Sequence, residues 1–411
     1  MRARLAVACS FALVVLVPAT ARTDGAAGGS PTTLAGFLAA PTPHWVDRID
    51  DLVAGHHVSV AVGYQGNFLY RHDATVRRTP ASNEKLLLSM AVLDAIGPDE
   101  RLSTRVRAES PPDDGGVIRG DVWIIGRGDP ETGRPEMADL AKQMKQAGID
   151  RVHGRVMGST SYFAHDWWAV GWKEDFPAEE VPLPSALTFE GNVGPSGGHI
   201  DDPELRAAKS LLHQLEARGI AVSGHAGAGS PGKGLATVAK VLSAPMQTLL
   251  RKMDVDSINF FAEVLGKGLG AVLKGAPGTI VKGAKAISSF EDANDIARFE
   301  HHDCSGLSYA NRVTAAGIVR LLWVADEAPW LTDLRTALPH RGQGTLIHRL
   351  HGLRVRAKTG TLTSISALSG WVWLDHEEAW AEFSILSKGM AKTAAVHMED
   401  AIVKAVQHNA P

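Results

Sequence analysis

The residues with the clearest chemical potential are a serine and a lysine three positions apart, Ser82 and Lys85. A helical pattern begins at Ser82, which would place its hydroxyl near free backbone N–H groups, and the i, i+3 spacing would put the Lys85 amine on the same face. An amine kept neutral by burial could take the hydroxyl proton, which serine must lose to act as a nucleophile. A helix-capping serine followed by a solvated lysine has the same spacing, so this pair alone leaves both interpretations open.

Two further groups of residues could complete a site for acyl transfer. Ser257 and Asn259 supply a second hydroxyl and an amide at the start of another expected helix, although a helix cap explains them equally well. Lys358 lies in an otherwise apolar strand segment, where its charge needs an anionic partner, and a glycine two positions later would let another backbone or a ligand approach closely. Together, in the order S-x-x-K, S-x-N and K-T-G, the three groups indicate one catalytic site.

Segments from both ends of the chain must position these residues. Alternating and β-rich segments predict strands over 57–62, 68–70, 355–359, 366–374 and 380–386. Helical spacing predicts helices over 82–96, 245–252, 259–269, 313–324 and 393–407. Strands at both ends with helices between them favour an α+β fold, in which distant segments assemble one sheet, over alternating βαβ units.

The stretch between the first two groups differs from the rest of the chain. Residues 100–240 contain short strand-like segments among glycine and proline, with one expected helix over 203–218. We therefore predict an inserted subdomain at 100–240 within a main domain formed by 22–99 and 241–411.

The first residues have the pattern of a signal peptide, which we predict over 1–21. Two arginines precede an apolar run over 5–17, and Ala19-Thr20-Ala21 resembles a cleavage site. The run is shorter than the roughly 20 residues of a membrane-spanning helix, so we expect export without a firm membrane anchor. Cleavage there would leave Cys304 as the sole thiol, either as a buried small side chain or as a reactive group.

Composition narrows the possible partners. The chain of 411 residues carries 42 Lys and Arg against 45 Asp and Glu, a formal charge of -3. It therefore has no basic excess with which to bind nucleic acid through counterion release. The histidine pairs at 56–57 and 301–302 lack the spacing of a zinc site, and we expect neither a metal nor a cofactor.

The sequence resembles the class C low-molecular-mass penicillin-binding proteins, D-alanyl-D-alanine carboxypeptidases that often also act as endopeptidases. The resemblance lies in PASNEKL at 80–86, SINFFAE at 257–263 and AKTGTL at 357–362, and it covers nearly all of the expected mature chain. DCSGLS at 303–308 looks like family scaffold without chemistry, although cysteine replaces the usual glycine. The resemblance implies a penicillin-binding, serine β-lactamase-like transpeptidase domain, an antiparallel sheet flanked by helices, with a large insert.

The resemblance also implies a role for each residue of the site. Ser82 would attack the carbonyl of a D-Ala-D-Ala bond, Lys85 would take the proton, and two backbone N–H groups, of Ser82 and Thr361, would hold the oxyanion. The implied catalytic residues are Ser82, Lys85, Ser257, Asn259 and Lys358, and the implied substrate-binding residues are Thr359, Gly360 and Thr361.

The implied partners are peptidoglycan stem peptides, met in the periplasmic or other extracytoplasmic cell-wall space, and β-lactam antibiotics as covalent inhibitors. Two alternatives use the same residues: a non-catalytic cell-wall binding protein of this fold, and a serine β-lactamase or esterase. The sequence leaves open whether a terminal D-Ala or a peptide cross-link is preferred.

Overall fold

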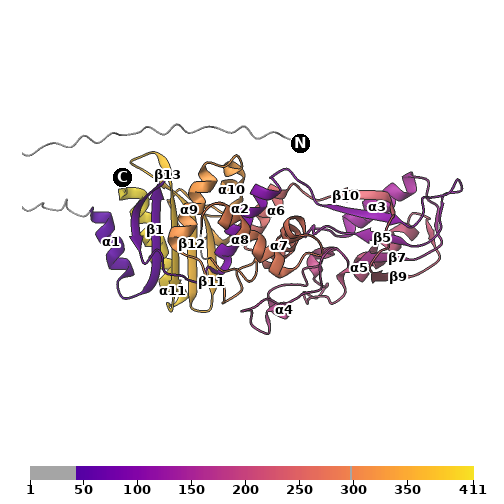
Figure 1. The fold of residues 1–411 in the computed structure, drawn as a ribbon, viewed down its shortest axis with the longest axis horizontal. Coiled ribbons are helices and arrows are strands. Elements are labelled where there is room, and N and C mark those ends of the chain that lie inside the picture. Colours follow the sequence, from indigo (N-terminus) through magenta and orange to yellow (C-terminus); the bar gives the residue numbers. More distant parts are fainter. Residues whose placement is uncertain (1–42, 297–298) are drawn as a thin grey trace, which may run out of the picture. The chain divides into compact units, whose positions relative to one another are not determined.

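One antiparallel sheet brings together both ends of the chain that the structure describes (Figure 1). The computed structural model describes residues 43–296 and 299–411, so the expected signal peptide at 1–21 lies outside it. The sheet order is β11-β12-β13-β1-β2, and β1 pairs with β13 from His57 opposite Lys388 to Gly63 opposite Glu382. Its strands are β1 (His57–Tyr64), β2 (Asn67–His72), β11 (Val355–Leu362), β12 (Ile365–Leu374) and β13 (Ala379–Lys388). The predicted α+β fold, with a sheet assembled from distant segments, is confirmed.

Both faces of this sheet are apolar and covered by helices. Successive side chains of a strand point to opposite faces, and in β1 Val60 and Val62 belong to one buried cluster while Ala61 belongs to another. The first cluster includes side chains of α1 (His44–Val53) and α11 (Lys392–Asn409). The second includes side chains of the central helices, which are α2 (Glu84–Ala95), α6 (Met246–Asp256), α7 (Asn259–Lys274), α8 (Ile280–Ala293), α9 (Ala315–Asp326) and α10 (Leu331–Ala337).

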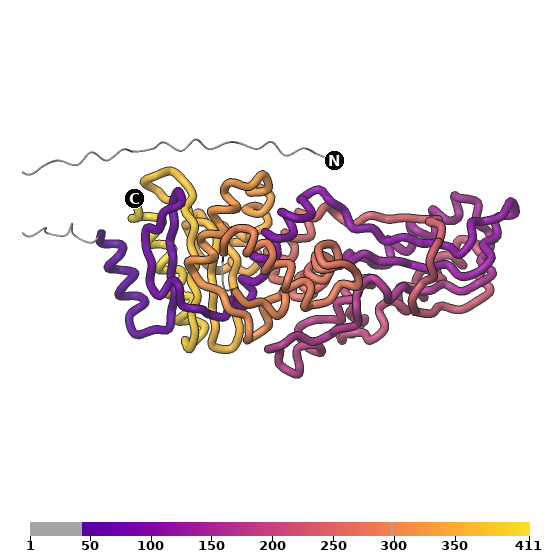
Figure 2. The backbone as a smooth tube through the Cα atoms, viewed as in Figure 1, coloured from indigo at the N-terminus to yellow at the C-terminus, as the bar shows by residue number. Residues whose placement is uncertain are grey.

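The chain between α2 and α6 forms a region beside the central helices (Figure 2). It contains two smaller sheets and a hydrophobic cluster of its own. The five-stranded sheet has the order β10-β3-β5-β7-β9 and the three-stranded sheet the order β4-β6-β8. Their strands are β3 (Ser103–Ala108), β4 (Val117–Ile118), β5 (Val122–Ile125), β6 (Arg151–Val152), β7 (Val156–Ser159), β8 (Ala221–Val222), β9 (Ala226–Gly229) and β10 (Ala236–Leu242). The helices of this region are α3 (Arg134–Gln146), α4 (Phe176–Glu179) and α5 (Pro203–Glu216). The domain boundaries at 99 and 241 stay a prediction.

Three helices of ten residues or more were not expected from the sequence: α1, α3 and α8. The expectation of one helix in the insert was therefore wrong. Helix α3 begins after a glycine rather than a Ser, Thr, Asp or Asn cap, and the Glu136 carboxylate accepts a hydrogen bond from the Gly133 N–H instead.

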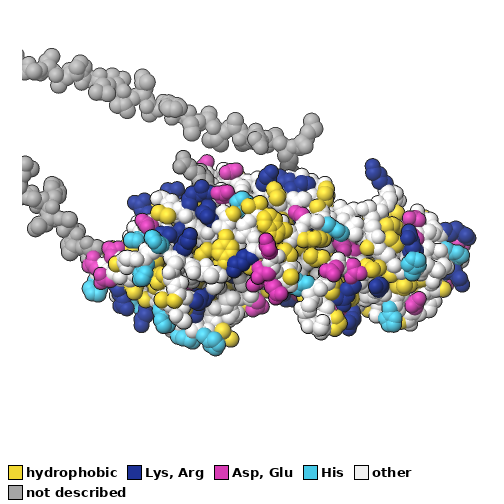
Figure 3. Space-filling model, turned by 90° about the horizontal axis from the view of Figure 1, so that it is seen from below, with side chains coloured by type: hydrophobic (Ala, Val, Ile, Leu, Met, Phe, Trp, Pro, Cys, Tyr) yellow, Lys and Arg dark blue, Asp and Glu magenta, His cyan; other side chains and the backbone are white. Residues whose placement is uncertain are grey.

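None of the described helices is both long and apolar enough to cross a bilayer. Lys and Arg side chains are interspersed with Asp and Glu on the face shown in Figure 3.

The two-sided burial of the main sheet predicts a large stability loss for Trp371→Ala in β12. The Trp371 side chain is fully buried and its indole N–H donates to Asp326 at 2.9 Å. Truncation leaves a cavity and should cost about 3–5 kcal/mol of unfolding free energy. Urea unfolding followed by tryptophan fluorescence would measure it, with Trp168→Ala, at a side chain 51% exposed, as the control. Equal losses in the two variants would contradict this picture.

Candidate active site

The nucleophile candidate Ser82 lies in a tight turn directly before α2. The turn, Ala81–Asn83, is a single 3₁₀ turn that runs directly into α2, so the α-helix begins at Glu84, two residues after the predicted start at Ser82. Ala81, which precedes Ser82, has a φ of 47°, outside the helical region. A positive φ at alanine costs energy and is maintained only by its surroundings. Helix α2 then carries Lys85 one turn later, so that its Nζ lies 3.1 Å from the Ser82 Oγ.

Lys85 is completely buried and is held by two further oxygens. Its Nζ donates to the Asn259 Oδ1 at 2.8 Å and to the Ser305 carbonyl at 2.6 Å. Burial lowers the pKa of Lys85 to about 8, although nearby carboxylates, led by Asp303 and Glu263, oppose the shift. A base with a pKa near neutral pH, in hydrogen-bond contact with a serine hydroxyl, is the arrangement that general-base catalysis requires.

The second hydroxyl and the second lysine are in contact with each other. Ser257 ends α6 in the left-handed region, with φ 57° and ψ 41°, which separates α6 from α7. Its Oγ accepts a hydrogen bond from the Lys358 Nζ at 2.9 Å. Burial lowers the pKa of Lys358, and the positive charge of Lys85 lowers it further. Asp254, fully buried on α6 and bonded to the Ser89 hydroxyl at 2.6 Å, is the acid that opposes this shift.

A pocket of ≈ 340 Å³ opens onto these groups. The residues that line it are Ser82, Lys173, Phe176, Glu180, Ser257, Asn259, Leu307, Tyr309, Thr345, Thr359, Thr361, Leu362 and Thr363. Five of the eight residues singled out from the sequence line the pocket directly, whereas Lys85, Lys358 and Gly360 are buried behind the lining. The volume suits the end of a peptide or a drug-sized molecule.

Gly360, the glycine of the K-T-G motif, must be small because the backbone before Ser82 lies against it. A Cβ at this position would lie 2.7 Å from the Pro80 carbonyl oxygen and 3.1 Å from the Ala81 Cβ. Strand β11 therefore packs backbone to backbone against the turn that carries Ser82. This close approach brings the hydroxyls of Thr359 and Thr361 to the same pocket as Ser82.

The loop at 303–308 contributes to the site, although the sequence analysis treated it as scaffold without chemistry. The Ser305 carbonyl holds Lys85, and the backbone N–H groups of Cys304 and Ser305 donate to the Glu263 carboxylate at 3.0 and 2.7 Å. The Asp303 carboxylate accepts from the Trp172 indole at 2.7 Å, which ties the insert to this loop. Glu263 lies four residues after Asn259 on α7, and this helical spacing was the available signal.

Cys304 is fully buried in this loop, and burial raises the pKa of its thiol well above the ordinary value. The thiol is thus held in its unreactive protonated form. Within the described residues, no group of three or more His, Cys, Asp or Glu side chains is placed to hold a metal ion.

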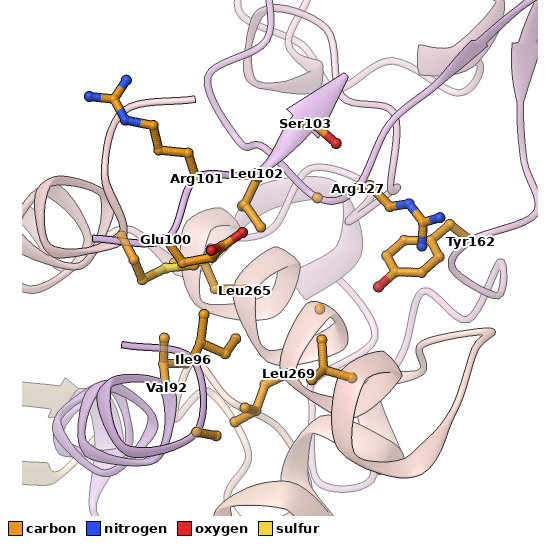
Figure 4. Close-up of a pocket in the computed structure, with 15 residues that line it drawn as sticks. Val92, Ile96, Glu100, Arg101, Leu102, Ser103, Arg127, Tyr162, Leu265 and Leu269 are labelled. Atoms are coloured by element: carbon orange, nitrogen blue, oxygen red, sulfur yellow. The ribbon is translucent and has the colours of Figure 1, made fainter. Parts of the chain in front are cut away.

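Another pocket, also of ≈ 340 Å³, contains none of the residues predicted for the site (Figure 4). Its walls come from the C-terminal end of α2, from α7 and from the start of the insert, including Val92, Leu102 and Leu269. Among the residues that line this pocket, Arg127 places its guanidinium carbon over the Tyr162 ring, 4.1 Å from the ring centroid. This second pocket has no serine and lysine pair comparable to Ser82 and Lys85. We therefore assign the catalytic chemistry to the pocket lined by Ser82.

Comparisons with known proteins identify a family to which the chain is similar. The model of the D-Ala-D-Ala carboxypeptidase 3 (S13) family matches residues 49–197 and 186–409. The D-alanyl-D-alanine carboxypeptidase of Actinomadura sp. strain R39 is 28% identical over 82% of this chain and 78% of its own length. Carboxypeptidase Rv3627c of Mycobacterium tuberculosis is 29% identical over 91% of this chain and 82% of its own length.

Solved structures share the fold at low sequence identity. Penicillin binding protein 4 of Haemophilus influenzae has a TM-score of 0.76 at 19% identity, over 87% of this chain and 98% of that one. A penicillin G acylated predatory endopeptidase of Bdellovibrio bacteriovorus, solved with an immunity protein, has a TM-score of 0.52 at 18% identity, over 85% and 91% of the two chains.

The tight contact at Gly360 predicts that Gly360→Ala displaces the turn that carries Ser82. A displacement of about 1 Å can cost on the order of 100-fold in rate. Mass spectrometry of Ser82 modified by an activated ester would give the labelling rate, which we expect to fall by that order while the protein stays folded. Gly232→Ala, where an added Cβ meets nothing within 4 Å, is the control. Equal labelling rates in both variants would contradict the geometry.

Proposed function

Since the chain belongs to the D-Ala-D-Ala carboxypeptidase 3 (S13) family, we propose that it is a serine-type D-alanyl-D-alanine carboxypeptidase acting on peptidoglycan stem peptides. The observation that carries this proposal is the contact of 3.1 Å between the Lys85 Nζ and the Ser82 Oγ, at a pocket where Lys358 supplies a second, buried cation. A non-catalytic binding protein would need neither a general base nor its compensating acids.

Acylation begins when the Ser82 Oγ attacks the carbonyl carbon of the penultimate D-Ala. Lys85, in its neutral form, takes the hydroxyl proton, and the backbone N–H groups of Ser82 and Thr361 stabilise the negative charge on the carbonyl oxygen. The C–N bond then breaks and the leaving D-Ala amine receives the proton from Lys85 through the Ser257 hydroxyl, while the Asn259 side chain orients the Lys85 amine. Water hydrolyses the resulting ester, which returns the proton to Ser82 and releases the shortened peptide.

Substrate selection rests on the terminal carboxylate. Lys358 lies behind Ser257 and Thr359, and its positive charge attracts an anion into the pocket while the hydroxyls of Thr359 and Thr361 donate to it. Penicillins carry a carboxylate in the equivalent position and an acyl carbonyl next to it. They therefore acylate Ser82 and act as covalent inhibitors.

An endopeptidase activity on peptide cross-links is a second candidate. The pocket rim formed by Lys173, Glu180 and Thr363 is exposed, which leaves room for a leaving group larger than D-Ala. Both substrates lie outside the cytoplasmic membrane, and we propose that the segment at 1–21 directs export to that compartment.

The nucleophile assignment predicts one penicillin on Ser82. Intact-mass measurement after brief exposure to benzylpenicillin, followed by peptide mapping, should find a single adduct on the peptide that contains Ser82. The adduct should be absent from Ser82→Ala and unchanged in Ser230→Ala, a variant at an exposed loop position. No adduct on the folded protein, or an adduct that persists in Ser82→Ala, would refute the assignment.

Penicillin labelling combined with substrate assays separates the remaining alternatives. A stable adduct together with D-Ala release from a stem pentapeptide would support the carboxypeptidase, and cleavage of a cross-linked dimer would support the endopeptidase. Rapid return of free enzyme after labelling, without D-Ala release, would favour a β-lactamase or esterase.

The base assignment predicts how acylation depends on pH. Lys85 must be neutral to take the proton, and its pKa is about 8, so the second-order rate of penicillin acylation should show a rising limb with a midpoint near 8. A plateau is not expected, because Lys358, whose pKa burial also lowers, loses the charge that attracts the penicillin carboxylate as the pH rises. Stopped-flow or quenched-flow measurement from pH 6 to 10 would test it. A rate that is flat across this range would exclude Lys85 as the titrating base.

A further inference from the structure

A fully buried histidine bridges two buried carboxylates beside the catalytic lysine. The His301 Nδ1 lies 2.5 Å from the Glu84 Oε1, and its Nε2 lies 2.8 Å from the Glu291 Oε2. The side chains of His301 and Glu84 are 0% exposed and that of Glu291 is 2% exposed. A neutral imidazole has one N–H, whereas each ring nitrogen here faces a carboxylate. The arrangement therefore fits an imidazolium that donates to both acids.

This bridge connects directly to Lys85 from two sides. Glu84 precedes Lys85 in the sequence and belongs to the first turn of α2. Ser305, four residues after His301, supplies the carbonyl that accepts from the Lys85 Nζ at 2.6 Å. Glu291 lies on α8 and anchors the ring from the far side. His301 thus links the backbone on both sides of the base to a third element.

The bridge also sets a charge close to the base. Burial raises the pKa of Glu84 to about 7, and attraction to His301 opposes that rise. Burial alone would lower the pKa of His301, but Glu84 and Glu291 outweigh it and raise the pKa well above its ordinary value. Ionised Glu84 raises the pKa of Lys85 against the effect of burial, together with the larger contributions of Asp303, Glu263 and Asp254.

Charged groups from several elements act on His301 and on Lys85. His301 faces Glu84 on α2 and Glu291 on α8, and the Phe299 ring packs edge-on against it at 6.0 Å. The charged groups that act on Lys85 are Asp254 on α6, Glu263 on α7, Asp303 in the loop, Glu84 beside it and Lys358 on β11.

From this geometry we infer that His301 is a positioning residue for acylation: its imidazolium bridges Glu84 and Glu291, keeps Glu84 ionised beside Lys85 and fixes the loop whose Ser305 carbonyl orients the Lys85 amine. The inference rests on the proposed function, because it concerns the base of that reaction. It adds to that function a residue which contacts neither substrate nor nucleophile.

The test is the pH profile of benzylpenicillin acylation in Glu84→Gln and His301→Gln. Glu84→Gln removes a negative charge beside Lys85. His301→Gln leaves Glu84 without its counter-charge, so that Glu84 takes up a proton. Each change lowers the pKa of Lys85, and the rising limb of the profile should move to lower pH by roughly half a unit, since Glu84 acts on Lys85 less than Asp303, Glu263 or Asp254 does.

Two matched variants distinguish positioning from a general loss of packing. Glu291→Gln removes one of the two charges that stabilise the imidazolium but keeps the contact between Glu84 and His301, so the limb should move less than in Glu84→Gln. His302→Gln changes the neighbouring histidine, which pairs with the half-exposed Glu300, and should leave both rate and limb unchanged. The inference would be overturned if the rising limb of the pH profile stayed at the wild-type pH in Glu84→Gln and His301→Gln. It would also be overturned if the limb moved equally far in Glu291→Gln.

A second measurement does not depend on the folding of any variant. In wild-type protein with ¹⁵N-labelled histidine, both His301 ring nitrogens should give protonated shifts from pH 6 to 8. A neutral tautomer at pH 7 would overturn the inference. Failure of the wild-type protein to react with penicillin would instead refute the proposed function, and the two failures are thus distinguishable.

Discussion

The constraint on which the rest of the site depends is the burial of two lysine side chains within one small volume. Lys85 and Lys358 are both 0% exposed, and removing an ammonium group from water is costly unless it is hydrogen-bonded and balanced by opposite charge. Fully buried acids on three elements supply the opposite charge. They are Glu84 on α2, Asp254 on α6 and Glu263 on α7. The floor of the pocket is therefore a charge-balanced layer, not an ordinary apolar core.

That layer is imperfectly satisfied, which fits a functional site. Among the described residues, the Glu84 Oε2, the Asp254 Oδ1, the Glu263 Oε2 and both polar atoms of the Asn83 side chain are buried without a hydrogen-bond partner. Ala81 adds a positive φ next to the nucleophile. Such features reduce stability. They are retained here around the groups that hold Lys85 at a useful pKa, a trade of stability for activity of the kind common in enzymes.

Local patterns in the sequence predicted much of the fold, and long-range contacts account for what was missed. Alternation and helical spacing identified the terminal strands and α2 because those signals lie within a few residues. The bridge at His301 could not be identified that way, since its partner Glu84 is 217 positions distant, and zinc spacing was the only criterion applied to the histidine pair. The positive φ of Ala81 could not be predicted either, because it depends on the packing of this backbone against Gly360 and Gly306.

The pairing of β1 with β13 determines when the chain can first become active. The ribosome makes the nucleophile segment early, whereas Lys358 and the strands that flank it are among the last residues made. In a growing chain that ends before β11, the main sheet consists of only the hairpin of β1 and β2, and an isolated hairpin is marginally stable. Such a fragment contains Lys85 but not Lys358. Hydrolytic competence therefore arises only after nearly the whole chain has been synthesised and folded.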